Sequence, residues 1–180
     1  MVNEVLINRI FFEDVKQYVN QNYRRRKKIS KPILRCIYKS SEDGHYENID
    51  LFTTSKSRKL VDLKDKLDET WQQALFNYID IKEYRDPEVY KRASISKQTF
   101  SKIRSDINYQ PNKDTAIQIC IGLKLNIDES TDLLKKAGFA LSKSIKRDLV
   151  VRYFIENEIY LMDDLNLVLN EMHLKIFPIN

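Results

Sequence analysis

The chain has 180 residues, of which 42% are hydrophobic and 32% charged, a composition typical of a globular protein and not of a disordered one. Its 3 glycines and 4 prolines are too few for a collagen-like chain or an all-β fold with many tight turns. The net charge is +5, and it is unevenly spread: residues 82–147 carry 14 Lys/Arg against 8 Asp/Glu, whereas residues 148–180 carry 2 against 6.

The first 57 residues begin with a helical pattern and continue into a mixed one. Apolar residues recur at helical spacing and predict a helix over residues 9–23: Ile10, Phe11, Val15 and Tyr18. Two short strands are expected over residues 33–39 and 48–54, joined by a turn at Asp43–Gly44. The N-terminal region, residues 1–57, is therefore expected to be α or α+β, and its role does not follow from its sequence.

A basic run follows the predicted first helix: Arg24, Arg25, Arg26, Lys27 and Lys28. Such a run can be an arm that contacts the phosphates of a nucleic acid. More often such a run is the solvated end of a helix, since cations are favourable at a helix C-terminus.

From residue 58 to residue 138 the pattern is strongly helical. Apolar residues step by three or four through one long helix or two abutting ones: Leu60, Leu63, Leu67, Trp71 and Leu75. Each later helix has a start or stop signal. The expected caps are Asp68, Asp86 followed by Pro87, Ser96, Asn112 or Asp114, Asp128, and Gly138 at a C-terminus.

Residues 139–180 form an acidic tail with two expected amphipathic helices, over 143–157 and 163–174. The tail has an apolar face made by Val150, Tyr153, Phe154, Leu161, Leu165 and Leu169. The start of the chain has a second one made by Leu6, Ile10, Phe11 and Val15. Either face is a candidate for the contact of a homodimer.

The segment DPEVYKRASISKQTFSKIRSD, residues 86–106, has the pattern of a helix-turn-helix. A helix ends at Ala93, a short turn follows, and a second helix begins after Ser96. Ile95 can fill the gap between the helices, while Phe100 and Ile103 face the core. Polar side chains are left on the outside of the second helix, where they can enter the major groove of DNA.

Residues 69–138 resemble the lambda-repressor/Cro-like (XRE-type) DNA-binding domain. TWQQALFNYIDIKEYRD resembles its first helix, PEVYKRA its second, and SISKQTFSKIRSD its turn and recognition helix. PNKDTAIQICIGLKLNIDESTDLLKKAGF resembles its fourth and fifth helices. The resemblance implies a mainly α protein with a five-helix repressor-like bundle. The chain is similar, to a lesser degree, to the helical tail of some bacterial macro-domain proteins.

Four features depart from the family's pattern. Ser94 and Asp106 stand where the family usually has glycine, and Tyr90 stands where it usually has alanine. Asp106 is expected to adopt the left-handed backbone that glycine would. The segment INYQPNKD is also longer than the usual linker.

The resemblance places base contacts on Lys97, Gln98 and Lys102, with Thr99 and Ser101 as secondary neighbours. Lysine can donate to guanine O6 and N7, and glutamine can read adenine through its amide. Phosphate contacts are expected from Arg104, Lys113 and the backbone amides near Ser96.

Motifs of common enzymes and metal sites are missing from the sequence. It has no GxGxxG, GxxxxGK[ST], HExxH or GxSxG, and Cys36, Cys120, His45 and His173 lie far apart. We therefore expect no catalytic residues, no metal and no cofactor. The chain also has no run of about 18 apolar residues and no signal-peptide pattern, so we expect no membrane partner and a cytoplasmic location.

The sequence therefore favours a bacterial or phage-type regulator of transcription that binds double-stranded DNA, as a homodimer on two half-sites. A non-enzymatic alternative stays open. The outer face of the helix-turn-helix can also dock on a protein partner, in an adaptor subunit of a defence or toxin–antitoxin system.

Overall fold

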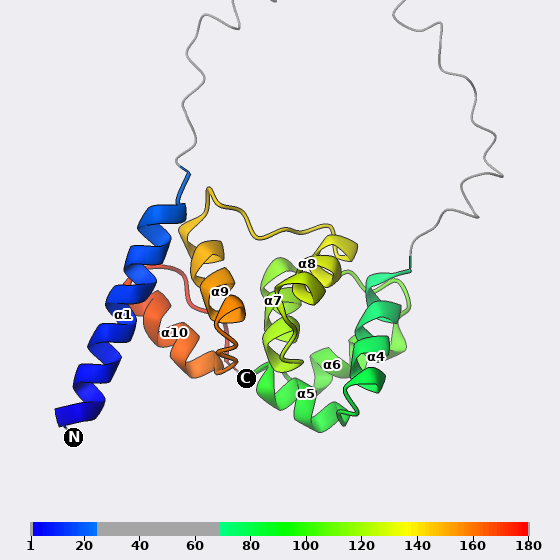
Figure 1. Ribbon diagram of the computed structural model, residues 1–180. Coiled ribbons are helices and arrows are strands. Elements are labelled where there is room, and N and C mark those ends of the chain that lie inside the picture. Colours follow the sequence, from blue (N-terminus) through cyan, green and yellow to red (C-terminus); the bar gives the residue numbers. More distant parts are fainter. Residues whose placement is uncertain (1, 25–68, 180) are drawn as a thin grey trace, which may run out of the picture. The chain divides into compact units, whose positions relative to one another are not determined.

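The computed structural model describes residues 2–24 and 69–179, and side chains from Arg9 onward. These residues form eight α-helices and no strand, which confirms the mainly α prediction for this part of the chain (Figure 1). The helices are α1 (Val2–Asn22), α4 (Trp71–Ile81), α5 (Asp86–Arg92), α6 (Lys97–Ser105), α7 (Lys113–Gly122), α8 (Ile127–Lys136), α9 (Lys146–Glu156) and α10 (Met162–Glu171).

Several expectations fall outside the described residues and are not tested by them. These are the strands over 33–39 and 48–54 with their turn at Asp43–Gly44, the apolar positions Leu60, Leu63 and Leu67, and Cys36, His45 and Arg25–Lys28. The described residues belong to one unit, made of Met1–Arg24 and Glu69–Asn180.

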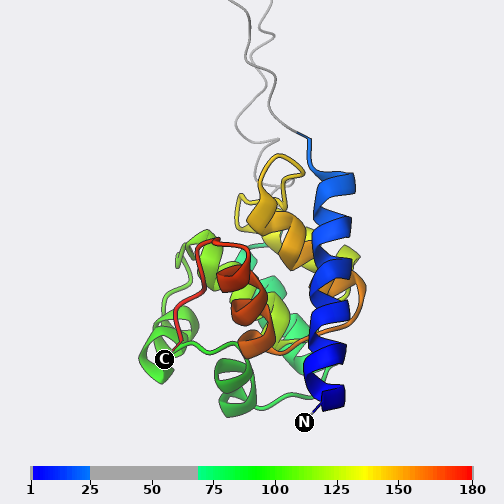
Figure 2. The same ribbon diagram turned by 90° about the vertical axis from the view of Figure 1, so that its left-hand side faces the viewer.

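Helix α7 lies at the centre of the packing among α4–α8. All its residues from Thr115 to Gly122 are buried. It contacts both α5 and α8, while α4 packs on α8 and α6 on α5. Figures 1 and 2 show these five helices grouped together.

Most helix starts follow the capping rules, but not always at the expected residue. Of the two expected candidates, Asn112 and Asp114, it is Asn112 that caps α7, accepting a hydrogen bond of 2.7 Å from the Thr115 amide. Asn126, and not Asp128, caps α8, since its Oδ1 accepts from both the Asp128 and the Glu129 amides. Gly138 has a φ of 78° just beyond the C-cap of α8, as expected for a C-terminal glycine.

Two more caps differ from the expectation. The cap of α4 is Thr70 and not Asp68: Thr70 Oγ1 accepts from the Gln73 amide, and Gln73 Oε1 accepts from the Thr70 amide. This is a capping box, which satisfies two amides at once. Helix α5 begins at Asp86 itself, with Arg85 as its N-cap.

Helix α1 packs along α9. The Phe11 ring meets the Phe154 ring edge-to-face at 5.7 Å, and Tyr18 meets Tyr153 in the same way at 5.1 Å. The Tyr18 hydroxyl donates to Glu156 Oε2 at 2.5 Å. Just beyond the helix, the Arg24 amide donates to the Lys143 carbonyl at 2.9 Å.

The apolar face of α1 packs on α9, so part of each face expected to form a dimer contact is covered within one chain, while Ile10 and Leu161 stay exposed. Val15, Val150, Phe154, Leu165 and Leu169 are fully buried, which corrects their assignment to a surface. The periodicity of apolar residues predicts that each helix has an apolar face, but it does not predict which other helix packs against that face.

The last residues form a strap, residues 172–179, that returns across the tail helices. Phe177 is fully buried, and Asn166 of α10 holds its backbone by donating to its carbonyl and accepting from its amide. The Arg147 guanidinium lies 3.9 Å from the Phe177 ring centroid. Farther along, Gln118 of α7 donates to the Pro178 carbonyl at 2.8 Å. The strap thus ties the tail to α7.

In the ranges 2–24 and 69–179, no helix is both long enough and apolar enough to cross a membrane.

Candidate nucleic-acid interface

A tight turn joins α5 to α6. Ser94 has a φ of 52°, a left-handed conformation that allows the chain to reverse within a few residues. The Ser94 amide donates to the Lys91 carbonyl at 3.1 Å and the Ile95 amide to the Tyr90 carbonyl at 3.0 Å. The Ile95 side chain is buried, as expected for a residue that fills the space between the two helices.

Both ends of α6 are fixed by hydrogen bonds. At its start, Ser96 Oγ accepts from the Thr99 amide at 3.1 Å, which confirms the predicted cap. At its end, Gln72 of α4 donates through Nε2 to the Ile103 carbonyl at 2.6 Å and lies 3.2 Å from the Arg104 carbonyl. These carbonyls have no partner within the helix, so a buried amide satisfies them.

Gln72 was not among the residues expected at the site. The one available signal was a polar side chain on the otherwise apolar inner side of the helix that begins at Trp71.

The inner side of α6 belongs to the core. Phe100 and Ile103 are buried as predicted, and Phe100 packs against Phe76 of α4 and Tyr90 of α5 at ring distances of 6.4 and 5.9 Å. Tyr90, which departs from the family's pattern, therefore has a packing role. Three aromatic rings fix the orientation of α6 about its own axis.

The outer side of α6 presents polar side chains to solvent. Lys97, Gln98, Ser101 and Lys102 lie on this side, and none of them is buried. None of the four forms a side-chain hydrogen bond or ion pair with another described residue. Helix α6 carries three cations and no carboxylate, so this face is positively charged.

The remaining predicted contacts have partners within the protein. The Ser96 and Thr99 hydroxyls are 2.9 Å apart and close the start of α6. Arg104 donates to Asp86 Oδ1 at 2.5 Å and lies 4.5 Å from the Phe76 ring centroid. These groups mainly hold the α6 scaffold together.

Lys113 also forms an ion pair within the protein, with a carboxylate of the tail. Its Nζ donates to Asp148 Oδ2 at 2.5 Å, and Asp148 accepts a further bond from the Ser142 amide. The Asp148 side chain is only 4% exposed, so removing Lys113 would leave a buried charge unpaired.

A neighbouring ion-pair group ties α7 to α9 and to the strap. Asp114 accepts from Arg147 at 2.5 Å and from Lys175 at 3.0 Å. Burial would raise the pKa of Asp114, but the hydrogen bonds from Arg147 and Lys175 outweigh it and lower the pKa below its ordinary value. The tail is thereby locked to the start of α7.

The segment after α6 has a different backbone conformation from the one expected. Asp106 has a φ of −108°, which is ordinary extended backbone and not the left-handed conformation expected there. Its carboxylate accepts from the Asn108 amide at 3.0 Å, and Tyr109 then packs against Trp71 with ring centroids 6.2 Å apart. The longer linker therefore covers the start of α4.

No protein-family model, curated protein or solved structure matches the chain. The resemblance of residues 69–138 to the repressor family stays a prediction. So does the phosphate-contacting arm, because only Arg24 of that basic run is described.

Proposed function

We propose that this chain binds double-stranded DNA sequence-specifically and regulates transcription. In this proposal α4–α8 are a repressor-like five-helix bundle and α6 is its recognition helix. The observation that carries the proposal is the outer side of α6, where Lys97, Gln98, Ser101 and Lys102 reach solvent and are unpaired among the described residues. The opposite side of the same helix is fixed in the core.

The order of side chains on α6 suits major-groove contact. Lys97 and Gln98 lie in its first turn, which is the part of a recognition helix that reaches base edges. Lys102 lies one turn farther on. Lysine would donate to guanine and the glutamine amide would pair with adenine.

The structure narrows the set of proposed DNA contacts. We assign Lys113 a structural role and not a phosphate contact, because its ammonium group forms an ion pair with the buried Asp148 carboxylate. Arg104 can contribute to a phosphate contact only by sharing its charge with Asp86. Ser96 and Thr99 position the helix start, so their backbone amides and not their hydroxyls are the proposed phosphate donors.

The test is a titration of the full chain with a duplex selected from a random pool, at several salt concentrations. Affinity should fall steeply with salt, because each neutralised phosphate releases counterions. Lys97→Ala, Gln98→Ala and Lys102→Ala should each weaken specific binding by about 1–3 kcal/mol.

A matched control is Lys135→Ala, which removes the same charge from an exposed position on α8. This variant should lose only the small share of affinity that comes from net charge. If no duplex binds even at low salt, the DNA proposal fails, and a protein-docking role for α6 takes its place.

A further inference from the structure

The buried side-chain amide of Gln118 links the strap, residues 172–179, to the turn between α5 and α6. Gln118 belongs to α7 and is only 1% exposed. Its Nε2 donates to the Pro178 carbonyl of the strap at 2.8 Å and lies 3.5 Å from the Ser94 carbonyl of the turn. In both views of the molecule the end of the strap accordingly lies beside the group of helices α5–α7 (Figures 1 and 2). One amide therefore reaches two segments that are far apart in the sequence.

The turn at Ser94 needs support from its surroundings. Ser94 has a φ of 52°, and a serine in this left-handed conformation persists only where neighbouring contacts hold it there. Helix α6 begins at Lys97, three residues after Ser94, so the conformation of the turn sets the direction in which α6 leaves α5. A contact on the Ser94 carbonyl is thus placed where it can act on the whole of α6.

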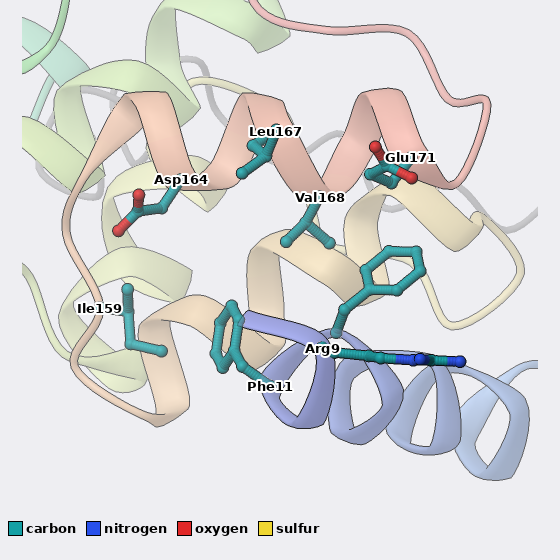
Figure 3. Close-up of a pocket in the computed structure, with 8 residues that line it drawn as sticks. Arg9, Phe11, Ile159, Asp164, Leu167, Val168 and Glu171 are labelled. Carbon is teal, nitrogen blue, oxygen red and sulfur yellow. The ribbon is translucent and has the colours of Figure 1, made fainter. Parts of the chain in front are cut away.

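The strap itself is held by α9 and α10. Asn166 of α10 makes two hydrogen bonds with the backbone of Phe177, and the Arg147 guanidinium of α9 lies 3.9 Å from the Phe177 ring centroid. Leu167 and other residues of α10 line a cavity of about 490 Å³ beside α1, and Asn166 is not part of this lining (Figure 3). The contacts that hold the strap are therefore separate from that cavity, and they can be changed without altering α5, α6 or α7.

We propose that Gln118 is a positioning residue, through which the docked strap fixes the turn before α6. While the strap is docked, the shorter bond to Pro178 holds the Gln118 amide next to the Ser94 carbonyl. When the strap leaves, the amide loses this bond and is no longer held toward the turn, so the turn opens more often. The acidic tail is thereby coupled to the helix-turn-helix of residues 86–106.

The first test measures hydrogen exchange at the backbone amides of Ser94 and Ile95 by NMR, in the full chain without DNA. Both amides donate to carbonyls of α5 across the turn, so their exchange reports its opening. Gln118→Met keeps the size of the side chain but removes the donor. It should speed the exchange of both turn amides by roughly three- to tenfold, the effect of one lost hydrogen bond. Amides in the middle of α8 should change less.

Asn166→Ala loosens the strap from a distance. It removes both hydrogen bonds to the Phe177 backbone, and it should also speed the exchange of the two turn amides. The matched control is Asn170→Ala, the same substitution at an exposed position one turn farther along α10, which should exchange like the wild type. Phe177→Leu gives a second way to loosen the strap, since it keeps an apolar side chain but removes the ring beside Arg147. Circular dichroism spectra should show each variant folded.

A combined variant tests whether the effect passes through Gln118. Adding Asn166→Ala to Gln118→Met should not speed the exchange of the two turn amides any further, because the link to the strap is already lost. Two results would overturn the proposal. In the first, Gln118→Met or both strap variants leave the turn amides as in the wild type. In the second, Asn166→Ala speeds their exchange equally with and without Gln118.

The consequence for DNA rests on the proposed function and is measured separately. Gln118→Met and Asn166→Ala should each weaken binding of the selected duplex by roughly threefold or more, as the fraction of chains with the turn in place falls. The slope of affinity against salt should stay the same, whereas a lost phosphate contact would lower it by about one. If no duplex binds the wild type, the proposed function fails, and the exchange measurements still decide the role of Gln118. If the duplex binds these variants as tightly as the wild type, the coupling to DNA binding is overturned.

Discussion

Gly122 of α7 lies directly against Ala93 at the end of α5. A Cβ on Gly122 would stand 2.7 Å from the Ala93 Cβ and 2.8 Å from its backbone nitrogen. These two small residues let α5 approach α7 closely. The position of the turn before α6 therefore depends on a residue in another helix, 29 positions away.

Gly122→Ala should destabilise the protein. In an open helix the same change would stabilise by about 1 kcal/mol, but overpacking against backbone costs about 1–3 kcal/mol. We expect a net loss of about 1 kcal/mol or more, measured by urea denaturation. Adding Ala93→Gly should recover only part of the loss, because the contact with the backbone nitrogen remains. A rise in stability for Gly122→Ala would contradict the close approach.

Ser94→Gly should stabilise the protein by about 0.5–1 kcal/mol, because Ser94 has a φ of 52° that glycine adopts without strain. The control is Ser101→Gly, the same substitution in the exposed middle of α6, which should cost about 0.5 kcal/mol, the difference between serine and glycine in helix propensity. Thermal unfolding of both variants should show a higher melting temperature for Ser94→Gly and a lower one for Ser101→Gly than for the wild type. If Ser94→Gly loses as much stability as Ser101→Gly, serine is not strained at position 94.

Local signals in the sequence predicted most of the α4–α8 region. Ser96, Asn112 and Gly138 act at the helix ends where capping rules placed them. The errors at Asp68 and Asp128 arose because several capping residues stand within two positions of each other, and only the backbone geometry selects one.

Long-range contacts could not be predicted in the same way. The pairing of α1 with α9 joins Tyr18 to Glu156 across 138 positions, and apolar spacing does not encode a partner. Phe177 lies outside any periodic segment, so nothing marked it as a core residue. At the candidate site, the sequence identified the exposed face of α6 but not the ion pairs that engage Arg104 and Lys113.

Stability at high pH should depend on Tyr18. Burial first, and then the hydrogen bond and charge of Glu156, raise the pKa of Tyr18 from 10.0 to about 12. The folded state holds this proton more tightly than the unfolded state, so the contribution is full below pH 10 and is lost as the pH rises toward 12.

Tyr18→Phe removes this contribution and provides the measurement. The variant should be less stable than the wild type at neutral pH, because Glu156 loses one donor and keeps Arg152. The difference in melting temperature should shrink as the pH rises above 10. A difference that stays constant over this range would show that Tyr18 does not titrate in the way proposed.

Phe177→Ala should destabilise the protein by about 3–5 kcal/mol, the usual cost of deleting a fully buried aromatic ring. The Arg147 guanidinium would also lose the ring on which it lies. Ile179→Ala, at a residue that is 59% exposed in the same strap, should change stability by less than about 0.5 kcal/mol. Urea denaturation of both variants makes the comparison, and similar small losses would show that the strap is not part of the core.

The central claim is that the outer side of α6 reads bases, and the most direct measurement compares the DNA sequences that different variants select from a random pool of duplexes. The wild type should enrich one motif, and Lys135→Ala should enrich the same one. Gln98→Lys should shift the preference at one base pair of each half-site from adenine toward guanine. The claim is contradicted if the wild type enriches no motif, or if Gln98→Lys selects the same motif as the wild type.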